Sequence, residues 1–340
     1  MKVIKKSKLE ETKPYAFDKK VLEREMAKGR SDPSLFYQTS STPVEDLDLI
    51  TMRRDMKNVG DDITEKEIIE ISKIIKIGKH RIQIFIYKED NHVKNRPVVM
   101  FMHGGGFFGG DGQMRANQCK YLAEQSGAVV VSPDYRLAPE NPYPAAVEDV
   151  QGTIQWIVSN EGFLEVNAEK FVVAGDSAGG TLAANCCRLD KEKRIKLAVY
   201  IYAGMDSTAA EETPYHWDYS MYGMDEEQKE YLMNRLYRFK SLTESVQKLY
   251  IPEGYSVQDE GISPLYMKDL SQMPRSLIIE AEFDYFRVSN DLFAQRLYEA
   301  GRDVEVILYE GMDHAFFDRI GIPPQVKDCI EEMARRIKEI

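Results

Sequence analysis

The sequence has no excess of basic residues and no long apolar run. Its 340 residues include 45 Lys and Arg against 56 Asp and Glu, a formal net charge of −11. Proteins that track nucleic-acid phosphates draw their affinity from clustered Lys and Arg, so we expect no nucleic-acid partner. The opening residues are basic but lack the apolar stretch of a signal peptide, and no later segment approaches the roughly 18 apolar residues of a membrane span. We therefore expect a cytoplasmic protein that does not enter a membrane.

Cysteine is scarce, and metal-binding patterns are missing. The four cysteines form no C-x-x-C pair, and two of them are adjacent in the chain: Cys119, Cys186, Cys187 and Cys329. Adjacent cysteines cannot easily bridge each other, so we expect four reduced thiols. There is also no H-E-x-x-H motif and no His/Cys cluster with the spacing of zinc ligands. We expect no metal and no cofactor.

Internal repeats, low-complexity tracts and long Pro/Gly/Ser linkers are also missing, which argues against independent domains. From residue 75 onward, short β-rich runs alternate with helical patterns, as is typical of an α/β fold with a mostly parallel central sheet flanked by helices. Alternating polarity over 82–88 predicts an edge strand, whereas continuous apolarity in the other runs predicts burial on both faces. We expect strands over 82–88, 97–103, 128–135, 171–177, 197–204, 276–284 and 304–311, and helices over 113–126, 145–159, 179–190, 290–300 and 324–338.

Two stretches fall outside this alternation: residues 1 to about 70 and residues 205 to about 255. The second is rich in aromatic side chains, among them Trp217, Tyr222 and Phe239. Taken singly, each aromatic fits a peripheral helical layer as well as a binding surface. Together they lead us to predict one domain over 1–340, with a helical cap formed from about 1–70 and 205–255.

Gly175-Asp176-Ser177-Ala178-Gly179 follows an apolar strand and precedes a helical pattern. In this context G-x-S-x-G predicts a sharp turn that projects a serine hydroxyl outward, with glycines where side chains would not fit. The start of the following helix adds a dipole that favours a developing anion. We predict that Ser177 is a catalytic nucleophile.

A second glycine motif, His103-Gly104-Gly105-Gly106, closes the expected strand at 97–103. Attack on an ester carbonyl creates an oxyanion, and peptide N–H groups can reach it only where no side chain shields the backbone. We predict an oxyanion hole formed by Gly105, Gly106 and Ala178. Gly104, His103 and Asp176 are predicted to support it.

Two histidines could serve as the general base. His314 lies just past the last expected strand, in Gly311-Met312-Asp313-His314-Ala315-Phe316, where it can reach back to the nucleophile. His103 lies beside the glycine loop, where anchoring the loop by hydrogen bonds is the more plausible role. We favour His314 as the base.

The base needs an acid that fixes its tautomer and stabilises the imidazolium. Asp284 ends the strand expected at 276–284 and gives the chain order Ser177, Asp284, His314 that this type of fold uses. Asp206, after the preceding strand, and Glu282 remain alternatives.

These residues resemble the α/β-hydrolases related to hormone-sensitive lipase, including bacterial acetyl esterases and carboxylesterases. The resemblance covers roughly 97–320 and rests on HGGGF (103–107), DYRLAPENPYPAAVEDV (134–150), GDSAGG (175–180), EAEFDYFR (280–287) and GMDHAF (311–316). It implies a Ser-Asp-His serine esterase with an α/β-hydrolase fold. The family usually has Pro-Leu after its acid, where this chain has Tyr285-Phe286, so the local match there is looser.

Other functions stay open at this point. Gly104-x-Gly106-x-x-Gly109, with Asp134 ending the next strand, also fits a dinucleotide-binding turn. A ligand-binding protein on a hydrolase scaffold is a non-enzymatic alternative, and lipase or peptidase activity could use the same triad. We favour hydrolysis of small-molecule esters with short acyl groups, acetyl to roughly hexanoyl. A homo-oligomer is compatible with the sequence.

Overall fold

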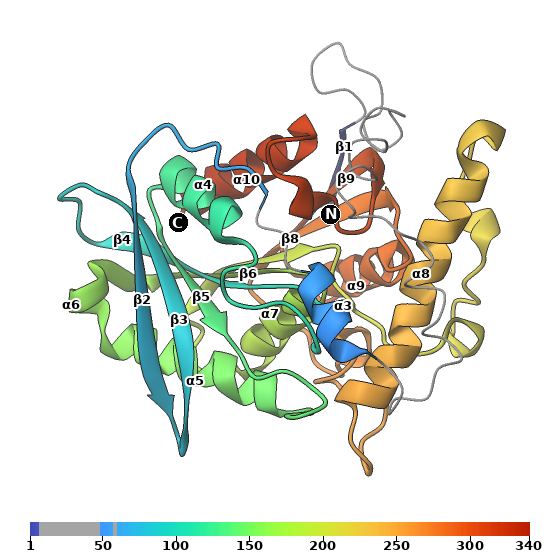
Figure 1. Ribbon diagram of the computed structural model, residues 1–340, viewed down its shortest axis with the longest axis horizontal. Coiled ribbons are helices and arrows are strands. Elements are labelled where there is room, and N and C mark those ends of the chain that lie inside the picture. The colour runs from blue at the N-terminus through green and yellow to red at the C-terminus, as the bar shows by residue number, and fades with distance from the viewer. Residues whose placement is uncertain (7–47, 57–59) are drawn as a thin grey trace.

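The computed structural model describes residues 1–6, 48–56 and 60–340. Strands from these residues form one sheet in the order β1-β9-β8-β7-β6-β4-β5-β3-β2 (Figure 1). All neighbouring strands are parallel except for β2–β3 and β3–β5, which are antiparallel. The strands are β1 (Lys2–Lys6), β2 (Ile68–Ile77), β3 (His80–Glu89), β4 (Arg96–Met102), β5 (Val129–Asp134), β6 (Val166–Asp176), β7 (Ile195–Ile201), β8 (Arg275–Phe283) and β9 (Val304–Asp313).

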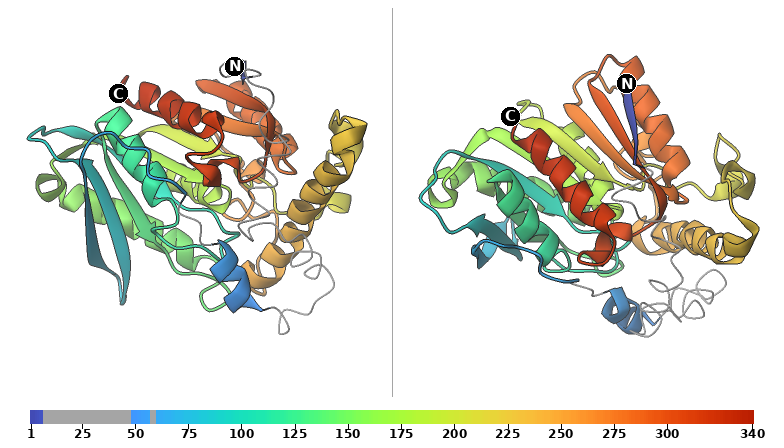
Figure 2. Two further views of the ribbon diagram at one scale, coloured as in Figure 1. Left: turned by 45° about the horizontal axis from the view of Figure 1, so that its top comes forward. Right: turned by 90° about the horizontal axis from the view of Figure 1, so that it is seen from above.

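Helices cover both faces of this sheet, as Figure 2 shows from two further directions. The α-helices are α3 (Leu49–Met56), α4 (Ala116–Ser126), α5 (Ala145–Ser159), α6 (Glu161–Leu164), α7 (Ala178–Leu189), α8 (Glu226–Tyr250), α9 (Arg287–Glu299) and α10 (Pro324–Ile337). Short 3-10 helices are η3 (Ala210–Glu212), η4 (Tyr219–Met221), η5 (Pro264–Tyr266) and η6 (Phe316–Arg319). The predicted α/β class, with a mostly parallel sheet between helices, is confirmed.

The sheet separates two apolar cores. On one face, Val150 of α5, Leu182 of α7 and Phe293 of α9 pack against the strands. On the other face, Leu122 of α4 and Ile330 of α10 do the same. The central strands are apolar on both sides because each side faces one of these helical layers, as their continuous apolarity predicted.

The predictions for the sheet edges need two corrections. Residues 82–88 are not an edge strand, because β3 pairs with β5 on one side and with β2 on the other. The true edge, β2, was missed because its charged residues obscure its period of two. In addition, Lys2–Lys6 forms the edge strand at the opposite side of the sheet. Both this strand and the start of β2 at 68–70 fell within the range that was predicted to join the cap. Residues 7–47 and 57–59 of that range lie outside the described residues.

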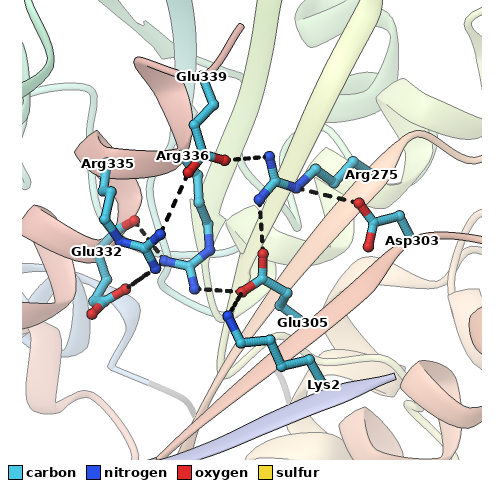
Figure 3. Close-up of polar contacts among 8 residues, drawn as sticks. All are labelled: Lys2, Arg275, Asp303, Glu305, Glu332, Arg335, Arg336 and Glu339. Carbon is cyan, nitrogen blue, oxygen red and sulfur yellow. Dashed lines mark hydrogen bonds and ion pairs between the residues drawn. The ribbon is translucent and has the colours of Figure 1, made fainter.

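Strand β1 is tied to the sheet by a cluster of ion pairs centred on Glu305 of β9 (Figure 3). Glu305 accepts hydrogen bonds from Lys2 of β1, Arg275 of β8 and Arg336 of α10, at 3.2, 2.8 and 2.7 Å. Burial of Glu305 acts to raise its pKa, but these three bonds outweigh it and lower the pKa to about 2. One carboxylate thus joins an edge strand, two inner strands and a helix.

Within the segment 205–255, the long helix α8 forms an outer layer at one end of the sheet (Figures 1 and 2). An aromatic cluster beneath it combines Trp217, Tyr222 and Phe239 with Tyr285 and Phe286, which follow β8. None of the helices in the described part of the chain is long and apolar enough to cross a membrane.

Candidate active site

Ser177 lies in the turn between β6 and α7, with backbone angles φ 53° and ψ −119°. The flanking glycines make this turn sterically accessible. A Cβ at Gly175 would lie 2.3 Å from the carbonyl oxygen of Gly179, and a Cβ at Gly179 would lie 2.0 Å from that of Met102. A serine at positive φ stores strain of about 1–3 kcal/mol, which the surrounding packing must offset. The turn holds the hydroxyl at the carboxyl end of the sheet.

His314 joins Ser177 to Asp284 by hydrogen bonds. Its Nε2 lies 3.0 Å from Ser177 Oγ, and its Nδ1 lies 2.8 Å from Asp284 Oδ2. Asp284 is oriented in turn, because its Oδ1 accepts a hydrogen bond from the Phe286 N–H at 2.9 Å. Both His314 and Asp284 are almost fully buried, at 2% and 1% exposure. In this geometry the imidazole can take a proton from the serine while the carboxylate faces its other nitrogen.

The two alternative acids have other partners. Asp206 accepts hydrogen bonds from the Thr208 N–H and the Tyr266 hydroxyl, at 2.9 and 3.2 Å. Glu282 accepts one from the Gly311 N–H at 2.7 Å. Of the three acids considered, Asp284 is the one that pairs with His314.

Aromatic rings surround His314. The ring centroids of Phe239, Tyr202 and Phe286 lie 4.1, 4.7 and 5.3 Å from that of the imidazole. These rings come from α8, the loop after β7 and the loop after β8. They limit the contact of water with the His314–Asp284 hydrogen bond, which strengthens electrostatic interactions there.

The glycine loop after β4 turns back on itself beside Ser177. Gly105 and Gly106 both have positive φ, 118° and 61°, and a Cβ at Gly105 would lie 2.2 Å from the carbonyl oxygen of Gly109. Gly106, Ala178 and Ser177 line the same pocket. These glycines do not open a helix as a dinucleotide-binding turn would, because α4 begins only at Ala116.

His103 lies against this loop rather than against Ser177. Its Nδ1 is 2.7 Å from the carbonyl oxygen of Gly104, and its ring stacks on Tyr135 at a centroid distance of 4.2 Å. The Tyr135 hydroxyl donates a hydrogen bond to the His103 carbonyl at 2.7 Å. Burial lowers the pKa of His103, so the ring is held neutral. These are the contacts of a residue that anchors the loop.

Asp176 links the two glycine motifs directly, and it is paired with Arg115, a residue that the sequence analysis missed. Asp176 Oδ1 accepts a hydrogen bond from the Gly104 N–H at 3.0 Å, and Oδ2 accepts one from Arg115 Nη2 at 2.9 Å. Arg115 also forms an ion pair with Asp318. Arg115 and Asp176 are 2% and 1% exposed. Buried charges must be paired, but no local pattern in the sequence marked this arginine, because its partners Asp176 and Asp318 are distant in the chain.

Comparison with known families identifies the family of this chain. A family model described as the α/β-hydrolase fold matches residues 99–318, a span that includes Ser177, Asp284 and His314. The chain belongs to the α/β-hydrolase family. This match, together with similarity to individual esterases, confirms the resemblance to the hormone-sensitive-lipase-like esterases.

Individual members of the α/β-hydrolase family are similar to this chain over most of its length. An arylesterase from Saccharolobus solfataricus is 28% identical over 267 residues, which cover 78% of this chain and 82% of that protein. Esterase LipI from Mycobacterium tuberculosis is 30% identical over 235 residues, covering 68% and 69%. The solved structure of an esterase from Pyrobaculum calidifontis matches with a TM-score of 0.72 at 27% identity, covering 91% of this chain and 98% of that one.

The pocket of this α/β-hydrolase opens beside Ser177 and encloses about 320 Å³, counting space open to solvent. Helix α8 contributes Leu242, Thr243 and Val246 to the lining, and the other lining residues come from outside this helix. The lining residues are Gly106, Phe107, Ser177, Ala178, Thr181, Gly204, Ser207, Leu242, Thr243, Val246 and Phe286. Segment 205–255 therefore contributes directly to this pocket.

Helix α3 holds the glycine loop of this hydrolase from outside, through Arg53. The guanidinium donates to the Phe108 carbonyl at 2.7 Å and to the Ala138 carbonyl at 2.8 Å. It also forms a two-pronged ion pair with Glu140, at 2.8 and 2.6 Å. Arg53 thus fastens the chain just after the glycines to the segment after β5. No motif in the sequence indicated this role.

Proposed function

We propose that this protein is a serine carboxylesterase that hydrolyses esters with short acyl groups, acetyl to roughly hexanoyl, through an acyl-enzyme. The hydrogen-bonded chain from Ser177 through His314 to Asp284 carries the proposal. The named functions of similar family members, arylesterase and esterase, support the same reaction class. The substrate is a small-molecule ester, and every group that the mechanism uses belongs to the chain itself. Cytoplasmic location stays a prediction from the sequence.

In the acylation step, Ser177 Oγ attacks the ester carbonyl carbon while His314 Nε2 takes the hydroxyl proton. The carbonyl electron pair moves to its oxygen, which the N–H groups of Gly105, Gly106 and Ala178 stabilise. Asp284 stabilises the imidazolium that forms. When the tetrahedral intermediate collapses, the bond to the alcohol oxygen breaks, and His314 returns the proton to the leaving alcohol.

In the deacylation step, water replaces the alcohol. His314 takes a proton from water as the water oxygen attacks the acyl carbon, and the same N–H groups hold the second oxyanion. Collapse breaks the bond to Ser177 Oγ, which regains its proton from His314. The products are a carboxylic acid and free enzyme.

The pocket lining supports a preference for short acyl groups. Beside Ser177, the pocket is lined by Thr181 and Gly204 and by Leu242 and Val246 of α8. We expect a short acyl group to pack among these side chains, where its apolar surface would contribute about 0.8 kcal/mol per buried methylene. We expect a longer chain to be hindered by α8, because Leu242 and Val246 of this helix line the pocket.

The test combines covalent labelling with a substrate series. Fluorophosphonate should label the native protein, and Ser177→Ala should abolish the label. Rates on p-nitrophenyl esters from acetate to palmitate should be highest for chains of six carbons or fewer. Absence of labelling would refute the serine mechanism, and a maximum beyond about ten carbons would refute the short-chain preference.

A further inference from the structure

Helix α8 contacts the loop that carries His314 through one arginine. Arg235 Nε donates a hydrogen bond to Asp313 Oδ2 at 2.7 Å, and Arg235 Nη2 donates one to the His314 carbonyl oxygen at 2.9 Å. Asp313 is 1% exposed, so its charge is withdrawn from water. A single side chain of the cap thus binds both the catalytic histidine's own peptide and the residue before it.

The carboxylate of Asp313 is clamped from two sides. Arg319, which follows His314 in η6, forms a second ion pair with it. Burial acts to raise the pKa of Asp313, but Arg235 and Arg319 outweigh it and lower the pKa, so the group stays charged. A buried ion pair stabilises a structure only when its geometry is well fixed. Removal of one partner leaves the other charge buried and uncompensated.

The backbone just after His314 needs such restraint. Ala315 has φ 68° and ψ 21°, in the left-handed region that alanine rarely adopts. Strain of this kind persists only where the surrounding contacts impose it. The bond from Arg235 to the His314 carbonyl acts on the peptide unit that joins these two residues.

The same face of α8 reaches the ring of His314 and the substrate pocket. One turn after Arg235, Phe239 packs on the imidazole at 4.1 Å, and the Arg235 guanidinium lies 5.1 Å from the Phe239 ring. About one and two turns beyond Phe239, Leu242 and Val246 line the pocket beside Ser177. Residues spaced by three, four and seven share one face of a helix, so pocket wall and histidine loop rest on one rigid element.

We propose that Arg235 is a positioning residue that holds the His314 loop to the cap helix, so that the imidazole is set for proton transfer when α8 is docked. The inference rests on the proposed serine esterase function. It implies that a displacement of α8, whose side chains line the pocket, also displaces the His314 imidazole. Loss of Arg235 should therefore reduce turnover more than substrate binding.

The experiment compares Arg235→Ala and Arg235→Lys with Lys229→Ala, an exposed matched control on the same helix. For p-nitrophenyl butyrate, Arg235→Ala should lower kcat about 10- to 100-fold with KM changed less than about 3-fold, because a small displacement of the base is costly. Arg235→Lys keeps the positive charge but lacks the planar guanidinium that donates two hydrogen bonds at once, so its kcat should lie between those of Arg235→Ala and the native enzyme. Lys229→Ala should match the native enzyme.

Two further measurements separate positioning from general loosening. The rate of fluorophosphonate labelling should fall with kcat in Arg235→Ala at temperatures well below its melting point. Asp313→Asn should cause a similar loss, and the double variant should be little worse than either single one. Should Arg235→Ala not fold, Arg235→Lys and Asp313→Asn supply the comparison.

The inference is overturned if folded Arg235→Ala retains native kcat, if KM rises with kcat unchanged, or if Lys229→Ala loses as much activity. If the native protein is labelled and Arg235→Ala is labelled at the same rate, the inference is refuted but the proposed function is not. No labelling of the native protein would refute the proposed function and, with it, this inference.

Discussion

Arg115 and Asp176 form a buried ion pair whose nitrogen and oxygen atoms lie 2.9 Å apart. Since the other oxygen of Asp176 accepts a hydrogen bond from Gly104, the pair connects the turn of Ser177 to the glycine loop. The arrangement of the site therefore depends on a residue 61 positions away from Asp176 in the chain.

Replacing this arginine should destabilise the whole protein. Arg115→Met leaves the buried Asp176 and the partly buried Asp318 without their shared cation, and breaking a buried pair costs about 3–5 kcal/mol. Denaturant unfolding would measure the loss. Asp176→Asn in the Arg115→Met background should restore part of it, because it removes one uncompensated charge. A loss below about 1 kcal/mol in Arg115→Met would contradict this account.

Removing the clamp on the glycine loop should slow catalysis. Arg53→Ala releases the carbonyls of Phe108 and Ala138, so the loop N–H groups are less well fixed for an oxyanion. We expect kcat on p-nitrophenyl butyrate to fall about 10-fold, which is less than the fall caused by removing one hydrogen-bond donor of an oxyanion hole. Arg54→Ala, on the same helix and exposed, is the matched control. Equal rates for both variants would rule out the clamp.

The buried carboxyl of Glu280 should make stability depend on pH. Burial, with a contribution from Asp291, raises the pKa of Glu280 well above its ordinary 4.5, and its Oε1 has no hydrogen-bond partner among the described residues. The folded protein therefore binds the proton more tightly than the unfolded chain. This contribution is fully present below about pH 4.5 and is lost as pH rises through the raised pKa.

Glu280→Gln removes the titration while keeping the shape of the side chain. We expect it to unfold at a higher temperature than the native protein at about pH 8, with the difference vanishing near pH 4. The exposed Glu299→Gln should show no such pH-dependent difference. Melting curves across this range provide the measurement, and a Glu280→Gln variant less stable at pH 8 would contradict the assignment.

Two substitutions in the pocket lining should change the preferred acyl length in opposite directions. Leu242→Ala removes bulk from the α8 wall and should raise relative rates on octanoate over butyrate. At Gly204 an added Cβ would meet Thr181 Oγ1 at 3.4 Å and Phe286 at 3.8 Å, ordinary contacts, so Gly204→Ala should fold and favour acetate. One methylene in an apolar pocket is worth about 1–3 kcal/mol of discrimination. Parallel shifts in both variants would show that these walls do not contact the acyl group.

Local patterns in the sequence determined the inner strands of the sheet, the sharp turn at Ser177 and the strand-end positions of Asp284 and His314. These features depend on neighbours within a few residues: apolar runs set the strands, and the glycines around Ser177 exist because a Cβ there would meet backbone. The fold class then predicted the order in which the nucleophile, the acid and the base follow one another along the chain. The α/β class itself could be predicted for the same reason.

Only the tertiary structure decided which candidate groups meet. His314 and Ser177 are 137 residues apart, and the choice of Asp284 over Asp206 and Glu282 depends on which strand ends lie side by side. The arginines at 53, 115 and 235 were invisible beforehand, because an arginine's partner is set by distance in space and a charged residue in sequence looks solvated. The edge position of Lys2–Lys6 escaped prediction likewise, since its pairing with β9 joins opposite ends of the chain.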